Sequence, residues 1–545
     1  MMIITSLLLL AIGFTLVFTL WKRMAHALQM LQQCHYMNDR FTTWIAGHRL
    51  VAFPLPLSVL VVIYWGLMVL TSLSTGISEV ALTWGALIIS LLGVGMIKIS
   101  SGVSKESKKP LKITARVWRI IATGVVVMLL FSGLGLALLG SPIELVGVQV
   151  IGWLLIFNLF AYFLMLVANW INKPMENSIR LGFINDARRI IKNSQSLDVV
   201  GVTGSYGKTS TKHALNAILS EQFNTLMTPE SYNTPMGITI TIRNYLKPIH
   251  SKFIAEMGAY KVGEINELCN IAYPKYGILT SVGPQHLETF KTIDHVKQTK
   301  FELIEFLPAD GIGFINIDDD NIRDYYENKF KGVCTVYTYG INQKADYRAK
   351  DIVVSEKGTT FNVVFRDGSV HEFQTKLLGL HNIYNTVASI ALGNELGIPV
   401  EKMKIAVRKM KPVTHRLELR RNGNFTIIDD AFNSNPVGSK MALEVLGQMS
   451  GKRIVLTPGM VDLGSAQYEL NKAFGTYMKD TCDYVILVGK KQTEPIQEGL
   501  AEVGFPKENI TVAENLTEAF KVMYEVVEPG AFVLIENDLP ELFAE

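Results

Sequence analysis

The stretch LDVVGVTGSYGKTSTKHALNAILSEQ, residues 197–222, combines an apolar β-branched run, a glycine-rich turn and a helical pattern. Strand, loop and helix in this order are typical of the phosphate-binding loop of an α/β protein. Gly204 and Gly207 allow the backbone N–H groups to face an anion, and the start of the following helix adds its dipole. The stretch therefore predicts a nucleotide site.

The side chains around these glycines predict how a nucleotide and a metal are held. Lys208 is expected to bridge the β- and γ-phosphates, with Ser205 beside it in the loop, and Thr209 or Ser210 is expected to give a hydroxyl to Mg²⁺. Glu256 ends the apolar run KFIAE, where a carboxylate reaches the metal beside the phosphates. We therefore expect ATP and Mg²⁺ as ligands.

Downstream of the loop, short β-branched runs alternate with helical patterns, as in KFIAEMG, YGILTSVG and GIGFINID. This alternation predicts an α/β domain built on a parallel sheet. Turn signals at Lys357-Gly358 and Asp367-Gly368 predict further strands, and Asn422-Gly423 predicts a hairpin that opens the last domain near residue 412.

The composition separates the chain into two parts. Hydrophobic residues make up 49% of the 545 positions, and the mean hydropathy of +0.24 is high for a soluble protein. A net charge of +3 without a basic, aromatic-rich run argues against nucleic acid as a partner. The four cysteines are widely spaced and lack metal-ligand spacing, so neither zinc nor a disulfide framework is expected.

The first 172 residues predict an α-helical membrane region. Segments of about 20 apolar residues match the thickness of a bilayer core. The first has no basic residues before it and is followed by Lys22 and Arg23, so it is interpreted as an uncleaved span. The five predicted spans are 3–20, 50–73, 78–97, 117–139 and 146–169.

The loops between these spans predict their orientation. Basic residues concentrate in the loops 21–49 and 98–116, whereas the other two connections carry none. By the positive-inside rule the basic loops face the cytoplasm of a bacterial-type cell, so the N-terminus lies outside and all residues beyond Trp170 lie inside. No charged residue falls well within a span, which favours an anchor over a transporter. A groove that presents a lipid-linked substrate is the second interpretation.

Ten motifs in register carry a family resemblance. They are GVTGSYGKTSTK, SYNTPMGI, AEMGA, GPQHLETF, KQTKFELIEFL, NIDDDN, LGLHNIYN, HRLE, DDAFNSNP and TPGMVDLG. In these motifs the chain resembles a Mur ligase, most closely the branch that adds D-alanyl-D-alanine to the cell-wall peptide precursor. The resemblance implies a P-loop ATP-binding central domain at 197–412 and a Rossmann-like C-terminal domain at 413–545, preceded by a linker at 173–196.

The resemblance also implies the chemistry. ATP phosphorylates a carboxylate, and an amine attacks the acyl phosphate to give an amide, ADP and phosphate; two Mg²⁺ ions neutralise the charge. Glu256 matches the metal ligand, His286 the histidine that supports the second Mg²⁺, and Lys300 the lysine that becomes carbamoylated. Asn233 aligns with the loop that faces the γ-phosphate and the carboxylate.

Four further residues match positions that close over the nucleotide. Asn382 and Asn385 resemble the adenine-contacting segment, with helix capping as the alternative. Arg416 and Asp430 match residues of the C-terminal domain that reach the ribose and phosphates.

The chain also departs from this branch. Five predicted spans stand where a soluble domain usually grips the UDP-sugar of the acceptor, so a lipid-linked acceptor is an alternative to a nucleotide-linked one. Asn471 stands where a histidine often follows, so a different amine, amino acid or dipeptide, is open. A polyglutamate-type ligase remains an alternative. A membrane-coupled P-loop ATPase or kinase is disfavoured, because no LSGGQ-like signature or C-terminal tyrosine cluster is present.

Overall fold

The computed structural model divides the chain into two compact units, a helical unit over residues 1–181 and an α/β unit over residues 182–545. The structure describes residues 2–73, 110–139, 146–285, 287–355, 358–412, 415, 417–431, 435–461 and 463–537. Two predicted site residues, His286 and Arg416, and the predicted span 78–97 lie outside these ranges.

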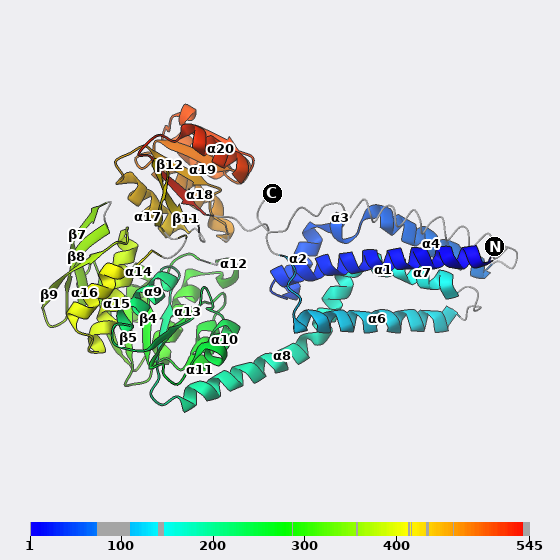
Figure 1. Cartoon of the computed structure of the whole chain (residues 1–545), viewed down its shortest axis with the longest axis horizontal. Helices are drawn as coiled ribbons and strands as arrows, with labels where there is room; N and C mark the ends of the chain where they lie inside the picture. The colour runs from blue at the N-terminus through cyan, green and yellow to red at the C-terminus, as the bar shows by residue number, and fades with distance from the viewer. Residues whose placement is uncertain are drawn as a thin grey trace. The chain divides into compact units, whose positions relative to one another are not determined.

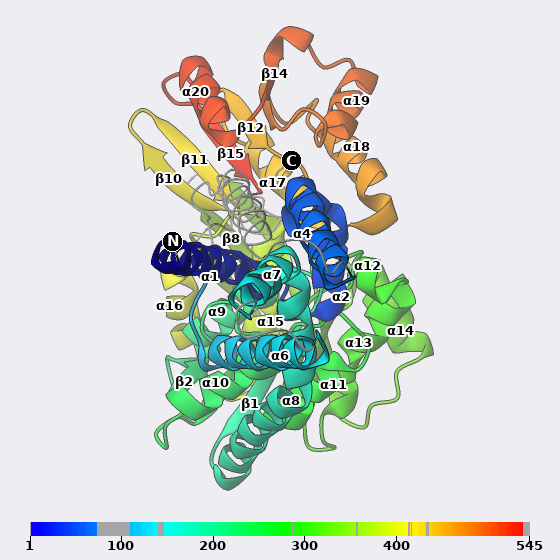
Figure 2. The ribbon, with the colours of Figure 1, turned by 90° about the vertical axis from the view of Figure 1, so that its right-hand side faces the viewer.

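The helical unit consists of helices that run alongside one another, with α7 against α1, α4 and α6 (Figures 1 and 2). Buried apolar side chains such as Leu16, Tyr64 and Leu155 join these helices. The described helices are α1 (Met2–Gln33), α2 (Asn38–Gly47), α3 (Arg49–Ala52), α4 (Leu55–Leu73), α6 (Ala115–Leu139), α7 (Val146–Leu159) and α8 (Ala161–Asn193).

The described residues do not support five membrane spans. One helix, Ala115–Leu138, is long and apolar enough to cross a bilayer, and the bent pair α7 and α8 would be a second if the two counted as one span. Helix α1 continues beyond the predicted end at residue 20 into a polar half that ends at Gln33. Helix α4 begins at Leu55, inside the predicted span 50–73, and its apolar part Leu55–Gly66 is by itself shorter than a bilayer span.

The predicted span 146–169 is wrong as a straight helix, because α7 and α8 meet at an angle of 78°. The buried Arg23 side chain donates from Nε to the carbonyl of Asn158 (2.7 Å) and from Nη2 to the carbonyl of Ala52 (2.8 Å). A side chain that takes a carbonyl out of the helical hydrogen-bond ladder favours a kink at that point. Arg23, one of the basic residues of the loop 21–49 that is predicted to face the cytoplasm, therefore stabilises this bend.

The two basic segments meet each other and the start of the predicted linker. Gln32 and the backbone of Lys112 exchange two hydrogen bonds, and the Arg116 guanidinium lies 3.9 Å from the ring centroid of Tyr36. Arg119 donates to Glu176 of α8 over 2.6 Å. The residues 173–196, predicted as a linker, are helical as far as Asn193.

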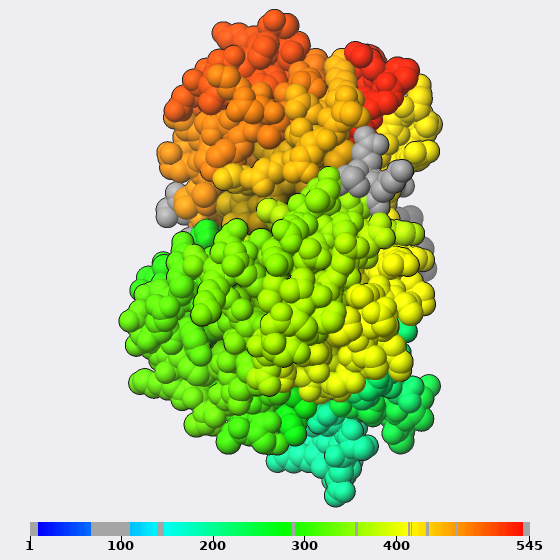
Figure 3. Space-filling view, turned by 90° about the vertical axis from the view of Figure 1, so that its left-hand side faces the viewer, coloured from blue at the N-terminus to red at the C-terminus, as the bar shows by residue number. Residues whose placement is uncertain are grey.

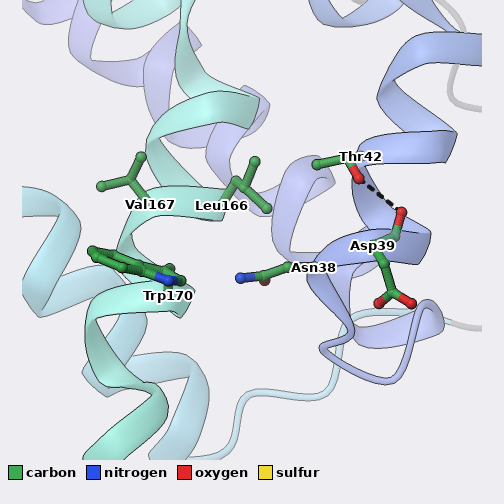
Figure 4. A pocket seen from close by; sticks show the side chains of 6 residues that line it. All are labelled: Asn38, Asp39, Thr42, Leu166, Val167 and Trp170. Carbon is green, nitrogen blue, oxygen red and sulfur yellow. Dashed lines mark hydrogen bonds between the residues drawn. The ribbon is translucent and has the colours of Figure 1, made fainter.

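A cavity of about 400 Å³ opens on the helical unit between α2 and α8. Figure 4 shows Trp170, Leu166 and Val167 of α8 on one side and Asn38, Asp39 and Thr42 of α2 on the other. Its lining includes none of the predicted nucleotide-site residues.

The central domain is built on a nine-stranded sheet in the order β2-β3-β1-β4-β5-β6-β7-β8-β9. The pairs from β2 to β7 are parallel, whereas β8 pairs antiparallel with β7 and β9, as the predicted turns require. Its strands are β1 (Asp198–Thr203), β2 (Thr225–Met227), β3 (Lys252–Glu256), β4 (Tyr276–Leu279), β5 (Ile312–Asn316), β6 (Thr335–Gly340), β7 (Tyr347–Ser355), β8 (Gly358–Val364) and β9 (Val370–Thr375).

Helices cover both faces of this sheet. Val200 and Val202 of β1 face a cluster with α9, α15 and α16, and Val199 faces a cluster with α10, α11, α13, α14 and the end of α8. This alternation follows from the period-two pattern of a strand buried on both sides. The helices are α9 (Lys208–Leu219), α10 (Pro235–Tyr245), α11 (Glu264–Ala272), α12 (Leu287–Phe290), α13 (Ile293–Phe306), α14 (Asp320–Asn328), α15 (Leu380–Glu395) and α16 (Val400–Lys409).

The C-terminal domain has a six-stranded sheet in the order β10-β11-β15-β12-β13-β14, parallel except for the β10–β11 hairpin. The hairpin turns at the predicted Asn422-Gly423. In Figure 3 the central domain is coloured green to yellow and the C-terminal domain is coloured yellow through orange to red. Its elements are β10 (Glu418–Asn422), β11 (Phe425–Asp430), α17 (Pro436–Gly447), β12 (Arg453–Thr457), α18 (Gln467–Tyr477), β13 (Tyr484–Val488), α19 (Glu494–Glu502), β14 (Ile510–Ala513), α20 (Leu516–Val526) and β15 (Phe532–Glu536).

Candidate functional site

The predicted phosphate loop joins β1 to the N-terminus of α9. Gly204 and Gly207 have φ angles of +153° and +80°, a region that side chains rarely adopt. A Cβ at Gly204 would lie 2.0 Å from the Thr280 Oγ1, and one at Gly207 would lie 2.7 Å from the Asn385 Oδ1. Both positions therefore require glycine, which brings the backbone N–H groups to the helix start where an anion binds.

The other loop residues are held by the neighbouring strand end. Lys208 folds back so that Nζ donates to the carbonyls of Gly204 (2.7 Å) and Ser205 (3.0 Å). The Ser205 hydroxyl is buried and exchanges hydrogen bonds with the backbone of Gly283. Ser205 thus ties the loop to the segment that precedes residue 286, and Lys208 lies over the loop.

Glu256 lies at the end of β3, beside β1, and is 1% exposed. Its Oε1 accepts hydrogen bonds from the Thr209 hydroxyl (3.1 Å) and from the Asn233 Nδ2 (3.2 Å). Its Oε2 lies 3.0 Å from the Nζ of Lys212. The structure therefore brings together Glu256, Thr209 and Asn233 as predicted, and it selects Thr209 rather than Ser210 as the hydroxyl beside the carboxylate.

These residues fit a magnesium nucleotide. A carboxylate and a hydroxyl at the ends of adjacent elements supply the hard oxygen donors that Mg²⁺ prefers. Asn385 supports the same conclusion, because its Oδ1 accepts from Thr211 (3.0 Å) while its buried Nδ2, beside the phosphate loop, has no hydrogen-bond partner among the residues that the structure describes. Among the described residues, no group of three or more His, Cys, Asp or Glu forms a complete metal cage.

Lys300 of α13 is 3% exposed, in the same domain. Burial, reinforced by the positive charge of Lys208, holds the pKa of the Lys300 amine well below its ordinary value. The nearby carboxylates of Glu302 and Glu264 act in the opposite direction. A neutral amine is the form that reacts with carbon dioxide, so the environment of Lys300 is suited to a carbamate.

Two further predicted residues lie at the ends of their elements. The Asn382 Nδ2 donates to the carbonyl of Leu378 (2.8 Å), whereas α15 begins after Gly379 without a side-chain cap, so the capping alternative is wrong for Asn382. Asp430 ends β11, where its Oδ1 accepts from the backbone N–H of Leu417 (3.1 Å). The adenine and ribose contacts expected of these residues remain predictions.

The domains that carry this site match models of a known protein family. The model of the Mur ligase middle domain matches residues 202–393, and that of the Mur ligase, glutamate ligase domain matches residues 415–536. Together the two ranges cover more than half of the chain. The chain belongs to the Mur ligase family. It is thus an ATP-dependent, ADP-forming ligase.

The relatives of this Mur ligase include the UDP-N-acetylmuramoyl-tripeptide–D-alanyl-D-alanine ligases of Bacillus subtilis and Escherichia coli. The first is 29% identical over 62% of this chain and 72% of its own length, and the second 31% identical over 54% and 65%. The solved MurF ligase of Thermotoga maritima in complex with ADP is 26% identical, with a TM-score of 0.59 over 66% of this chain and 80% of that one.

Sequence reasoning assigned no role to Asp318 in this Mur ligase. Asp318 follows β5 and accepts from the backbone N–H groups of Ile341, Asn342 and Gln343 and from the Tyr384 hydroxyl (2.8 Å). Burial acts to raise the pKa of Asp318, but these hydrogen bonds outweigh it and lower the pKa below its ordinary value. The sequence feature that could have pointed to Asp318 is its place in the motif NIDDDN, where it follows an apolar strand.

Asn471 has a structural role in the loop after β12, and the different amine that its place in the sequence leaves open stays a prediction. The side chain is 3% exposed, accepts from the backbone N–H of Met460 (2.8 Å) and donates to the carbonyls of Met460 (3.0 Å) and Gln467 (2.9 Å). Asn471 therefore holds the loop after β12 in shape.

We expect Asn471→Ala to lower the free energy of unfolding by about 1–3 kcal/mol, because buried backbone groups of Met460 lose their partners. Thermal unfolding of the purified chain measures the change. The neighbouring Lys472, which is half-buried and pairs with Glu502, provides the control Lys472→Ala with a much smaller effect. Equal effects of the two substitutions would refute the structural role of Asn471.

Proposed function

We propose that this Mur ligase forms an amide between a carboxylate of a cell-envelope peptide precursor and an amine, as the D-alanyl-D-alanine-adding relatives are named to do. The observation that carries the proposal is the arrangement of the buried Thr209 and Glu256 with the half-buried Lys208 and Asn233 at the carboxyl ends of β1 and β3. Phosphoryl transfer to a carboxylate depends mainly on the positioning of charged groups around the phosphates. The ends of β1 and β3 bring such groups together at one phosphate loop.

The residues of this chain have distinct parts in such a reaction. The phosphate loop binds the triphosphate, and Lys208 turns from the loop carbonyls to compensate charge on the β- and γ-phosphates. Thr209 and Glu256 would hold Mg²⁺, which supplies charge neutralisation when bound. Asn233 orients the Glu256 carboxylate and would face the γ-phosphate. The acceptor carboxylate attacks the γ-phosphorus, ADP leaves, and the amine then displaces phosphate from the acyl phosphate.

We also propose that the helical unit holds the enzyme on the cytoplasmic face of a membrane. Large apolar side chains on α1 and α6 are exposed, among them Phe14 (76%) and Leu138 (77%), and such surface is costly in water. The contact between the segments around Gln32 and Lys112 is in accord with the prediction that both basic loops lie on one side. In this arrangement the acceptor is a lipid-linked or a nucleotide-linked peptide.

The proposal is tested with the full chain in detergent or in membranes. The enzyme receives Mg²⁺-ATP, UDP-linked or lipid-linked muramoyl peptides, and either D-alanyl-D-alanine or glutamate, and phosphate release and product mass are followed. We expect phosphate release to require both the carboxylate and the amine. ATP turnover that needs no carboxylate, with no amide from any pair, would overturn the proposal. A product with glutamate alone would assign a polyglutamate-type ligase.

Lys300 gives a prediction about pH. A folded-state pKa below the ordinary 10.5 means that unfolding takes up a proton between the two values, so the stability of the parent chain rises with pH across that window. We expect Lys300→Met to remove this rise and the carbamate, measured as the unfolding midpoint against pH and as the intact mass in bicarbonate. Lys297→Met on the same helix removes an ion pair with Asp324 and should keep the rise. An unchanged pH slope in Lys300→Met would contradict the assignment.

A further inference from the structure

Lys212 lies one turn beyond Lys208 on α9, and its side chain is 0% exposed. Its Nζ lies 3.0 Å from the Glu256 Oε2 and donates to the backbone carbonyl of Glu230. A buried lysine is costly unless its charge is compensated and its protons are bonded. Lys212 meets this condition by joining two separate parts of the site, the end of β3 and the segment after β2.

The first part is the Glu256 carboxylate, whose two oxygens have different partners. Oε1 accepts from Thr209 and Asn233, and Oε2 faces Lys212. A Glu carboxylate with hydrogen bonds to one oxygen only can rotate about χ3, because the distribution of that torsion is broad. The ion pair with Lys212 therefore fixes which oxygen faces the Thr209 hydroxyl.

The second part is the segment from Glu230 to Thr234. Glu230 has a φ of +40°, in the left-handed region that non-glycine residues adopt at a cost. Its carbonyl is the one that Lys212 binds, and Asn233 follows three residues later. The segment is closed by a hydrogen bond from the Gly258 N–H to the Asn233 carbonyl (2.8 Å). Lys212 thus stabilises the backbone conformation that places the Asn233 amide on Glu256.

We propose that Lys212 is a positioning residue that orients Glu256 and Asn233 toward the magnesium nucleotide. The inference rests on the proposed function, since it assigns to Lys212 the support of that same site. Partners that orient metal-binding groups typically contribute about 10- to 100-fold to metal affinity or activity. The lysine does not touch the substrate in this role and acts through Glu256.

The test uses Lys212→Met in the full chain. We expect the Mg²⁺ concentration that gives half-maximal ligase activity to rise by about 10- to 100-fold. The dissociation constant of Mg²⁺, measured by calorimetry with a non-hydrolysable ATP analogue, should rise with it, because the carboxylate and the Asn233 segment lose their orientation. Nucleotide affinity without Mg²⁺ should stay within about twofold, because the phosphate loop is retained. Lys212→Arg, which keeps the charge, should recover part of the loss.

A matched control lies on the same two strands. Lys252 at the start of β3 pairs with Asp198 at the start of β1 over 2.5 Å, at the opposite end of the sheet from the phosphate loop. We expect Lys252→Met to lower thermal stability and to leave the Mg²⁺ dependence unchanged. A folded Lys212→Met with the Mg²⁺ affinity of the parent would overturn the proposal.

A double variant separates positioning from folding defects. In Lys212→Met/Glu256→Gln both charges of the pair are removed, and we expect the Mg²⁺ affinity of Glu256→Gln alone, because Lys212 acts through Glu256. A further, independent loss would overturn the proposal even if Lys212→Met itself does not fold. If the parent chain binds Mg²⁺ and nucleotide but forms no amide, the proposed function fails, and the calorimetric comparison still decides the role of Lys212.

Discussion

Lys208→Ala is expected to lower kcat/KM for ATP-dependent ligation by about 100- to 1,000-fold, the range observed when one charge-stabilising donor is lost from a preorganised site. The Lys208 Nζ donates to the carbonyls of Gly204 and Ser205, which keeps the ammonium beside the phosphate loop that would hold the triphosphate. Phosphate release under saturating acceptor and amine measures the effect.

The same substitution should change the fold little, because Lys208 is only partly buried. Lys275→Ala is the matched control: Lys275 precedes β4, pairs with Asp310 at the surface and lies at the amino ends of the strands. We expect this control to retain parent activity. Ligation by Lys208→Ala at the parent rate would show that the loop does not hold the reacting phosphates.

Glu256→Ala is expected to abolish measurable ligation and to destabilise the α/β unit. The substitution removes the carboxylate beside Thr209 and leaves the buried Lys212 ammonium without its partner. Breaking a buried ion pair in this way costs about 3–5 kcal/mol. Activity assays and thermal unfolding of the purified chain measure the two effects.

Adding Lys212→Met to Glu256→Ala separates the effect on stability from the effect on ligation. The double variant has no uncompensated charge, so we expect it to regain much of the lost stability while ligation stays absent. A double variant less stable than Glu256→Ala would mean that Lys212 is compensated by groups other than Glu256. Full activity in Glu256→Ala would exclude the carboxylate from the site.

Much of the nucleotide site was predictable because it depends on local chain geometry. Gly204 and Gly207 have the positive φ angles that their loop requires, and Glu256 follows a strand that pairs directly with β1. Short-range patterns of this kind survive folding, since a strand, a turn and a helix start are specified within a few residues. The turns at Gly368 and Gly423 were predictable for the same reason.

Other features depend on contacts between distant segments. Nothing near Arg23 in the sequence indicates that its guanidinium binds the carbonyl of Asn158 and stabilises a bend where a straight span was predicted. Nothing near Asn471 in the sequence indicates that its side chain bonds the Met460 backbone. Apolar content predicted where helices form but not where they bend. Hydropathy does not indicate which backbone carbonyls accept a hydrogen bond from a buried side chain.

The sequence by itself determined that a phosphate loop begins an α/β nucleotide-binding region, because glycines, a lysine and a β-branched strand restrict the backbone locally. Only the tertiary structure decided that Lys212, rather than another cation, faces Glu256, and that Asn385 lies against Gly207. These contacts join residues far apart in the chain, and their geometry follows from how the strands and helices pack.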